Sequence, residues 1–252
     1  DSCVRFHGRC ASSLNTGDVR QWVQHLSSRK LSPQRTRQHF AAVRFLYART
    51  LGRPEVVSFL AWPVDPESLP VVPSQAEVAT VLGALRSPTY RTFFATLYAT
   101  GLRVQEATQL TTEDVDAERG VLVVRHGKGG RQRLTILSPR LLELLRAYWS
   151  LVRPPGPWLF ATRKGTPLSA EVARRALHAA TRDCQLGKRL TPHSFRHAFA
   201  THMLEQGTDI RLIQVVLGHA SIRSTVRYAR VSTAMIARAR SPIDDLAMAS
   251  FG

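Results

Sequence analysis

Hydrophobic side chains recur with the period of an α-helix in the first part of the chain. One apolar stripe, in the segment for which Asp18 is the expected N-cap, comprises Val19, Trp22, Val23 and Leu26. A second stripe, after the sequence LSP, comprises Phe40, Val43, Leu46 and Tyr47. Because these positions repeat every three to four residues, we predict two helices that each bury one face in a small, all-helical N-terminal module.

This pattern stops at a proline-rich stretch, WPVDPESLPVVPS, which occupies residues 62–74. Its four prolines forbid a regular helix and favour an extended connection, so we place a domain boundary here. The second domain opens on the sequence SQAE. In it, Ser74 and Glu77 can cap the first turn of a helix reciprocally.

Beyond this capping box the periodicity predicts a mostly helical domain with one β-hairpin. Helices are expected at 75–86, 89–99, 103–111, 139–150 and 169–183, and over most of 193–239. Strands at 121–125 and 131–137 flank the turn sequence GKGG, and the sequence WLF is expected to form a short strand. The predicted fold class is therefore mainly α with a small β-hairpin or sheet.

The net charge of the chain indicates what kind of partner it binds. The chain has 35 Lys and Arg residues against 18 Asp and Glu, a formal net charge of +17. Such an excess repels itself and is tolerated best beside a polyanion, although a generally basic proteome is the alternative explanation. Arginine predominates, and its forked guanidinium suits contacts to phosphate. The arginines that we expect to contact DNA are Arg35, Arg37, Arg44, Arg131, Arg227 and Arg230.

Cysteine usage and hydropathy indicate the compartment. Cys3, Cys10 and Cys184 form no CxxC pair and leave an odd number, which argues against a disulfide framework and for a reducing environment. No apolar run approaches the roughly 18 residues that span a bilayer, and no signal-peptide pattern opens the chain. We therefore expect a cytoplasmic, nucleoid-associated protein.

Six polar residues from separate segments suit one reaction at a phosphodiester. In chain order they are Arg103, Lys128, His193, Arg196, His219 and Tyr228. The tyrosine hydroxyl can attack phosphorus and form a covalent phosphotyrosine, with His193 as the base. The two guanidiniums and His219 can bind the nonbridging oxygens, and Lys128 can protonate the leaving alkoxide. The bond energy stays in the protein–DNA link, so neither ATP nor a metal cofactor is required.

Each residue of this set also has a simpler interpretation. Arg103 can merely pair with Glu106, three positions later, and Lys128 can be an ordinary hairpin lysine. The sequence GKGG lacks the GxxxxGK[ST] spacing of a phosphate loop, and His219 can simply cap a helix. Taken singly, the functional interpretations are weak. The ordered set is strong.

Three histidines raise zinc as a further alternative, namely His193, His197 and His202. Histidines four positions apart share a helix face, as in zinc-binding helices. No glutamate follows His193 as in the HExxH motif, however, and no cysteine lies nearby. Zinc is therefore the minor interpretation.

The ordered set resembles the catalytic residues of the tyrosine recombinase, or phage integrase, family, and most closely those of Xer recombinases and integron integrases. Residues 191–231, TPHSFRHAFATHMLEQGTDIRLIQVVLGHASIRSTVRYARV, are similar to the family's second conserved box, and LYATGLRVQEATQL to its first. The resemblance implies a two-domain architecture. Its parts are a helical core-binding domain at 1–62, a proline-rich linker at 63–73, a mixed α/β catalytic domain at 74–240 and a C-terminal tail at 241–252.

The resemblance also implies roles for individual residues. The four that would activate the phosphate are Arg103, His193, Arg196 and His219. Lys128 would protonate the leaving 5′-hydroxyl, and Tyr228 would form a 3′-phosphotyrosyl link. Glu106 matches the acidic residue that often follows the first arginine and would support it. The chain departs from the family where Ala229 and Arg230 replace a common Thr-His pair. We also expect the N-terminal module to be short by about one helix.

The function implied by the resemblance is site-specific DNA recombination through a Holliday junction, in integration, excision, resolution or transposition of a mobile element or replicon. The partner would be double-stranded DNA with inverted-repeat core sites. A homotetramer would bind two duplexes and exchange C-terminal helices, for which residues 233–248 supply apolar side chains. Two other functions stay open: a DNA-binding relative without catalysis, and a monomeric enzyme similar to type IB topoisomerases.

Overall fold

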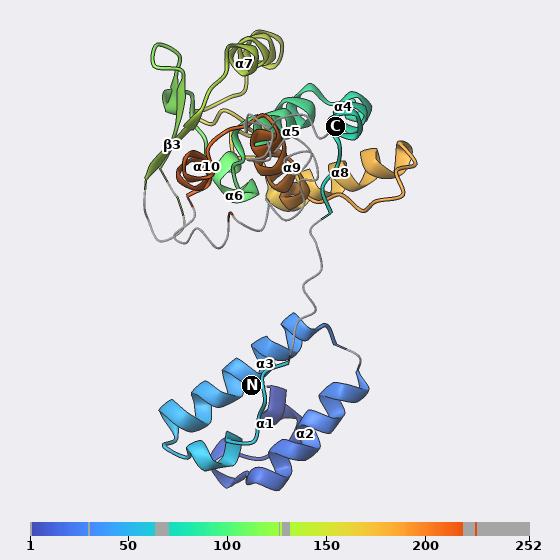
Figure 1. Ribbon diagram of the computed structural model, residues 1–252, viewed down its shortest axis with the longest axis vertical. Helices are drawn as coiled ribbons and strands as arrows, with labels where there is room; N and C mark the ends of the chain where they lie inside the picture. Colours follow the sequence, from blue (N-terminus) through green and yellow to red (C-terminus); the bar gives the residue numbers. More distant parts are fainter. Residues whose placement is uncertain are drawn as a thin grey trace, which may run out of the picture. The chain divides into compact units, whose positions relative to one another are not determined.

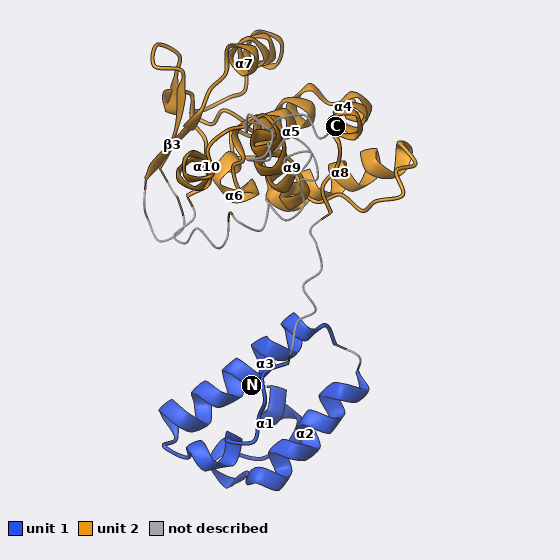
Figure 2. Ribbon diagram, viewed as in Figure 1, with its two compact units in different colours: residues 1–68 blue, residues 69–252 orange. Residues whose placement is uncertain are grey.

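The computed structural model describes residues 2–29, 31–63, 71–125, 127, 132–218 and 225. The chain divides into two compact units, Asp1–Ser68 and Leu69–Gly252 (Figure 2). Within the described residues, the structure contains no helix that is long and apolar enough to cross a bilayer.

The first unit consists of helices in its described residues (Figure 1). They are α1 (Ser2–His7), α2 (Thr16–Ser28) and α3 (Pro33–Phe45), with a π-helical turn at Leu46–Thr50 and 3₁₀ turns at Ala11–Ser13 and Pro54–Val57. Both predicted apolar stripes are confirmed, because α2, α3 and the π-helical turn after α3 contribute the stripe residues to one cluster around the buried Trp22 and Tyr47. The helix α1 is an addition to the prediction, and its Cys3 is buried in the same cluster.

The start of α2 differs from the prediction. Asn15, not Asp18, is the N-cap, and its side chain accepts a hydrogen bond from the Asp18 backbone N–H at 3.1 Å. The Asp18 carboxylate in turn accepts one from the Asn15 N–H at 2.8 Å. Asp18 therefore completes a capping box from the third helical position, where an acidic side chain is also favoured.

The second unit packs seven described helices and a small sheet around a main core, with a smaller apolar cluster between α9 and α10 (Figure 1). The helices are α4 (Gln75–Ala84), α5 (Pro88–Thr100), α6 (Val104–Thr108), α7 (Pro139–Val152), α8 (Ala170–Asp183), α9 (Pro192–Glu205) and α10 (Ile210–Leu217). The strands β1 (Val115–Asp116), β2 (Val121–Val124) and β3 (Arg133–Ile136) form an antiparallel sheet in that order. The predicted class, mainly α with a small sheet, is confirmed.

The helix α5 runs through the centre of this unit and contacts both α7 and α9. Its Phe93 and Phe94 are fully buried and pack edge-to-face. Phe93 also packs against Phe160, and Phe94 against Phe195 of α9. The end of α5 is thereby fixed relative to α9, which carries part of the predicted site.

The capping box predicted for α4 is confirmed. The Ser74 N–H donates to the Glu77 carboxylate at 2.7 Å, and the Glu77 N–H donates to the Ser74 hydroxyl at 3.2 Å. Lys188 also forms an ion pair with Glu77 at 2.9 Å, which ties the start of α4 to the segment before α9.

Three predicted elements of this unit differ in the structure. The helix α6 ends at Thr108 instead of 111, because Leu110 turns to accept a hydrogen bond from the Leu159 N–H at 2.8 Å. The sequence WLF is not a strand, since Trp158 makes only an isolated bridge to Thr111. The helical stretch predicted from 193 onward is broken between α9 and α10. Its continuation after residue 218, except for residue 225, and most of the GKGG turn lie outside the described residues.

Candidate functional site

Only part of the predicted site falls in the described residues. The described members are Arg103, Glu106, His193 and Arg196. The members outside the described residues are Lys128, His219 and Tyr228, together with the expected DNA contacts Arg131, Arg227 and Arg230.

A tight glycine turn brings Arg103 to α9. Gly101 ends α5 in the left-handed region, at φ 64°. A Cβ at this position would lie 2.5 Å from Cδ1 of Phe199 and 2.7 Å from Cδ2 of Leu217, closer than any real contact. Only glycine therefore fits between α9 and α10. Two residues later Arg103 begins α6 as its N-cap residue.

Arg196 joins the ends of two helices from a buried position. Only 3% of the residue is exposed. Its guanidinium donates to the Gly101 carbonyl at 2.5 Å, at the end of α5, and to the Leu217 carbonyl at 2.7 Å, at the end of α10. Carbonyls at helix C-termini carry partial negative charge, which favours a cation there. This arginine is thereby fixed beside the turn that leads to Arg103.

The Glu106 carboxylate is the centre of a second cluster. It accepts hydrogen bonds from the Arg103 backbone N–H at 2.8 Å and from the Arg103 guanidinium at 2.9 Å. Arg133 of β3 adds a forked pair at 2.8 and 2.7 Å. Burial by itself would raise the pKa of the Glu106 carboxyl, but the hydrogen bonds and charge of the arginines outweigh it and hold that pKa below its usual value. Glu106 is therefore ionised at neutral pH.

The pairing of Arg103 with Glu106 thus exists, as the simpler interpretation of the sequence required. This pairing leaves further hydrogen-bond donors on Arg103, because a guanidinium has five N–H groups. The Arg103 side chain also keeps 27% of its surface exposed, against 3% for Glu106. The geometry leaves this arginine able to bind an anion while the carboxylate fixes its orientation.

Arg133 is the residue of this cluster that the sequence analysis did not single out. Besides its pair with Glu106, its Nε donates to the Val216 carbonyl of α10 at 2.9 Å. The sequence RQRLTIL offers two neighbouring arginines, and nothing in their order indicates which one turns inward. Strand alternation does place Arg133 on the same face as the buried Thr135, which is the one signal available.

His193 lies in the first turn of α9, three positions before Arg196. Part of its side chain faces solvent. Desolvation of the rest lowers the pKa of the ring below its usual value, and the charges of Arg196 and Arg103 lower it further. The ring is therefore neutral at neutral pH, as a proton acceptor must be.

The zinc interpretation finds no ligand set in the described part of the chain. The rings of His193 and His197 lie 6.2 Å apart, and His202 is buried with its Nδ1 hydrogen-bonded to the Tyr98 hydroxyl at 2.8 Å. Among these residues no three His, Cys, Asp or Glu side chains gather as metal ligands would.

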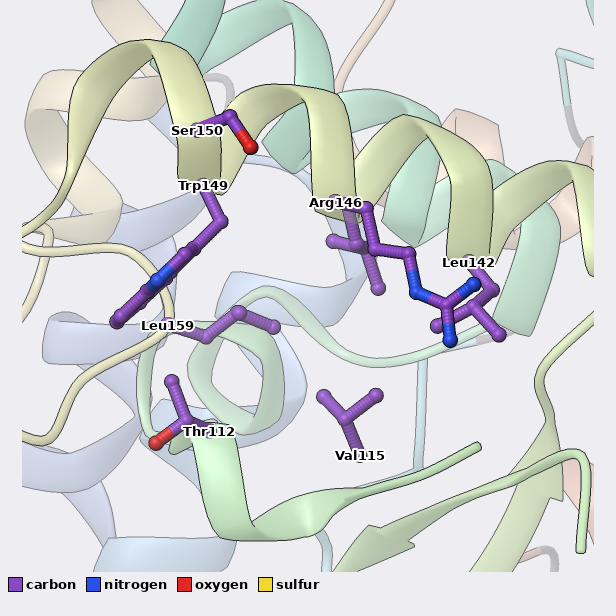
Figure 3. A pocket seen from close by; sticks show the side chains of 8 residues that line it. Thr112, Val115, Leu142, Arg146, Trp149, Ser150 and Leu159 are labelled. Carbon is purple, nitrogen blue, oxygen red and sulfur yellow. The ribbon is translucent and has the colours of Figure 1, made fainter. Parts of the chain in front are cut away.

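A groove of about 390 Å³ lies between α7 and the segment that leads into β1 (Figure 3). Trp149, Arg146 and Leu142 of α7 face Thr112 and Val115 across it. None of the predicted site residues lines this groove. Its walls are mainly apolar, with Arg146 as the charged group, so it offers no general base or carboxylate for catalysis.

The arginines predicted to contact DNA in the first unit differ in their surroundings. Arg35 is exposed, whereas Arg37 donates from Nε to the Pro63 carbonyl at 2.8 Å. Arg44 donates to the Leu60 carbonyl at 2.5 Å and lies 5.0 Å from the centre of the Trp62 ring. Two of the three therefore also hold the C-terminal end of the unit.

Comparison with known proteins covers nearly the whole chain. The sequence profile of the Phage integrase family matches residues 74–235, and that of the phage integrase N-terminal SAM-like domain matches residues 1–55. The protein y4qK of Sinorhizobium fredii is 39% identical over 244 residues, which are 96% of this chain and 79% of that protein.

Two further likenesses concern proteins named XerA. The tyrosine recombinase XerA of Thermococcus kodakarensis is 32% identical over 241 residues, which are 94% of this chain and 85% of the relative. A crystal structure of XerA recombinase superposes with a TM-score of 0.62 at 26% identity, covering 96% of this chain and 89% of that one.

Proposed function

Because the chain belongs to the phage integrase family of tyrosine recombinases, we propose that it is a site-specific DNA recombinase that cleaves and rejoins strands through a 3′-phosphotyrosyl link to Tyr228. The observation that carries this proposal is the convergence of Arg103, at the start of α6, with His193 and Arg196, near the start of α9, where Arg196 contacts the ends of α5 and α10. Two guanidiniums from distant segments, beside a neutral imidazole, suit a phosphodiester approached by a nucleophile.

The proposed reaction is a transesterification in which one P–O bond replaces another. The Tyr228 oxygen attacks phosphorus, and His193 takes the phenol proton. Arg103, Arg196 and His219 bind the nonbridging oxygens, whose negative charge grows in the phosphorane. The bond from phosphorus to the 5′-oxygen then breaks, and Lys128 supplies the proton to that oxygen. Attack by a 5′-hydroxyl from the partner strand reverses these steps.

Glu106 is assigned a supporting role in this scheme. It contacts the guanidinium and the backbone N–H of Arg103 and would orient them, without touching the phosphate itself. Its lowered pKa supports the assignment, because an ionised carboxylate keeps both arginines hydrogen-bonded throughout the neutral pH range.

The proposed partner is double-stranded DNA with inverted-repeat core sites. A homotetramer would bind two duplexes and recombine them through a Holliday junction, and residues 233–248 would dock on the neighbouring copy. Residues 1–62 would bind the core site, 63–73 would link them to the catalytic domain at 74–240, and 241–252 would form the tail. Such a protein would work in the cytoplasm, on nucleoid DNA.

The proposal is tested by giving the protein its own DNA site. A random duplex library is selected for bound sequences, and the best site is placed twice on a supercoiled plasmid. Recombination between the two sites supports the proposal. Relaxation without recombination would instead indicate a topoisomerase-like enzyme, and binding without cleavage would indicate a non-catalytic DNA-binding protein.

A further inference from the structure

Arg133 connects three segments that are distant in the sequence. Its fork holds Glu106, which in turn holds Arg103 at the start of α6. Its Nε holds the Val216 carbonyl in the last turn of α10. The side chain is only 10% exposed, so these bonds form largely out of water, where charge-assisted hydrogen bonds are strong.

The stem of the same side chain lies against the point where the chain leaves α10. Gly218 caps that helix at φ 64°, and a Cβ there would lie 2.8 Å from the Arg133 Cδ. The next residue in the chain is His219. In Figure 1, α10 lies between β3 and α6, the elements that Arg133 connects.

We propose that Arg133 is a positioning residue for the recombination chemistry, which orients Arg103 through Glu106 and fixes the last turn of α10. This inference rests on the proposed function. Arg133 contacts the carboxylate that holds Arg103, and it contacts the last turn of α10, where the Leu217 carbonyl accepts a hydrogen bond from Arg196.

Charge gives a second reason for the assignment. Arg103 and Glu106 alone would form a neutral pair, and the carboxylate would compete with a phosphate for the Arg103 guanidinium. With Arg133 added, two cations share one buried carboxylate, and the cluster has a formal charge of +1. Arg133 thereby leaves part of the Arg103 charge available to an anion.

Arginine is required at this position by geometry. The forked pair on Glu106 and the Nε bond to Val216 use three donors in one plane. A lysine ammonium is a point charge without that fork, so Arg133→Lys keeps the charge but cannot reproduce all three bonds.

The matched control is Arg125→Lys. Arg125 directly follows β2 and also pairs with a buried carboxylate, that of Asp114 at 2.5 Å, so its ion partners differ from those of Arg133. The same chemical change is thereby made at an ion pair of the second unit that the proposal does not involve, in which the carboxylate is buried and the Arg125 side chain is 46% exposed.

The experiment measures covalent adduct formation by the full chain in a single turnover, at saturating DNA. The probe is a nicked duplex of the selected site in which sulfur replaces the 5′-oxygen at the cleavage point. A thiol has a pKa of about 8.5, so this leaving group departs without a proton from Lys128. The rate of adduct formation with this probe therefore does not depend on Lys128, so a change that affects only Lys128 does not alter the rate of either variant.

We expect Arg133→Lys to slow adduct formation by on the order of 100-fold, as misplacement of an activating group does, while DNA affinity stays within about threefold. Arg125→Lys should stay within about threefold in rate. A further variant, Glu106→Gln with Arg133→Met, removes the buried charges together and so avoids an unpaired carboxylate. It should keep a thermal midpoint close to that of the Arg125→Lys control and yet lose a similar factor in rate.

The outcomes separate the two proposals. If Arg133→Lys and Arg125→Lys form adduct at the same rate, the positioning role is overturned while the proposed function stands. The positioning role would also be overturned if Arg133→Lys lost DNA affinity by as large a factor as it lost rate and also had a clearly lower thermal midpoint. A residue with a merely structural role shows such a combined loss. If the unsubstituted protein forms no adduct with the probe, the proposed function fails first.

Discussion

The substitution Gly101→Ala tests the packing that builds the site. Gly101 combines two constraints: a positive φ of 64°, and a space in which a Cβ would meet Phe199 at 2.5 Å and Leu217 at 2.7 Å. A left-handed conformation costs a non-glycine residue about 1–2 kcal/mol. Forcing a methyl into a packed core costs about 1–3 kcal/mol more. We therefore expect Gly101→Ala to lower the free energy of unfolding by about 2–5 kcal/mol.

A second glycine in the same unit separates the two constraints. Gly207 has a φ of 86°, but nothing lies within 4 Å of a Cβ built there. Gly207→Ala should therefore cost only the conformational part, about 1–2 kcal/mol. Differential scanning calorimetry measures both variants, and the excess for Gly101→Ala should lower the midpoint by about 2–12 °C relative to Gly207→Ala.

Equal midpoints for the two variants would refute the close approach of α9 and α10 to the end of α5. Gly101→Ala should also move the backbone carbonyl of residue 101, which accepts a hydrogen bond from Arg196. Under the proposed function, Gly101→Ala should therefore slow DNA cleavage even at temperatures where the protein stays folded, whereas Gly207→Ala should not.

Three other predictions follow from charge and protonation. If one copy neutralises on the order of eight phosphates, the logarithm of DNA affinity should fall with the logarithm of salt concentration at a slope of about −7, and a slope near zero would contradict a clamp that follows the backbone. Because the pKa of His193 is lowered, adduct formation should persist below pH of about 6.5 and decline only at lower pH, and His193→Gln should abolish that decline. Because the pKa of Glu106 is lowered in the folded state, its stabilisation is present above about pH 4.3 and is lost as the pH falls from there toward the folded value; thermal midpoints of Glu106→Gln should lack this part of the acid-induced loss.

Local signals made the helices predictable. The Ser74 and Glu77 pair formed the expected capping box because both of its bonds lie within one turn. Asp18 was placed wrongly as an N-cap because an acidic side chain suits both the N-cap and the third helical position, and only Asn15 decided between them. The sequence WLF has strand-forming residues, yet Phe160 is used in the core instead of in a ladder.

The sequence predicted those residues of the site that belong to recognisable motifs. Arg103, His193 and Arg196 were identified by their sequence and spacing, and the structure brings their segments together. Arg133 was not identified from the sequence, because its hydrogen bond to Val216 of α10 joins two residues that are 83 positions apart in the chain. Residue types on β3 also indicate the wrong buried face. The apolar Leu134 is 54% exposed, whereas the polar Thr135 is buried and donates to the Thr100 carbonyl at 2.8 Å.

The central claim is that Tyr228 attacks the DNA backbone, and covalent trapping tests it most directly. The protein is incubated with a nicked duplex of its selected site, and the denatured products are digested and analysed by mass spectrometry. We predict a 3′-phosphate linked to the peptide that contains Tyr228. Tyr228→Phe should bind the same duplex but form no adduct. An adduct that persists in Tyr228→Phe, or one that maps to another residue, would contradict the account.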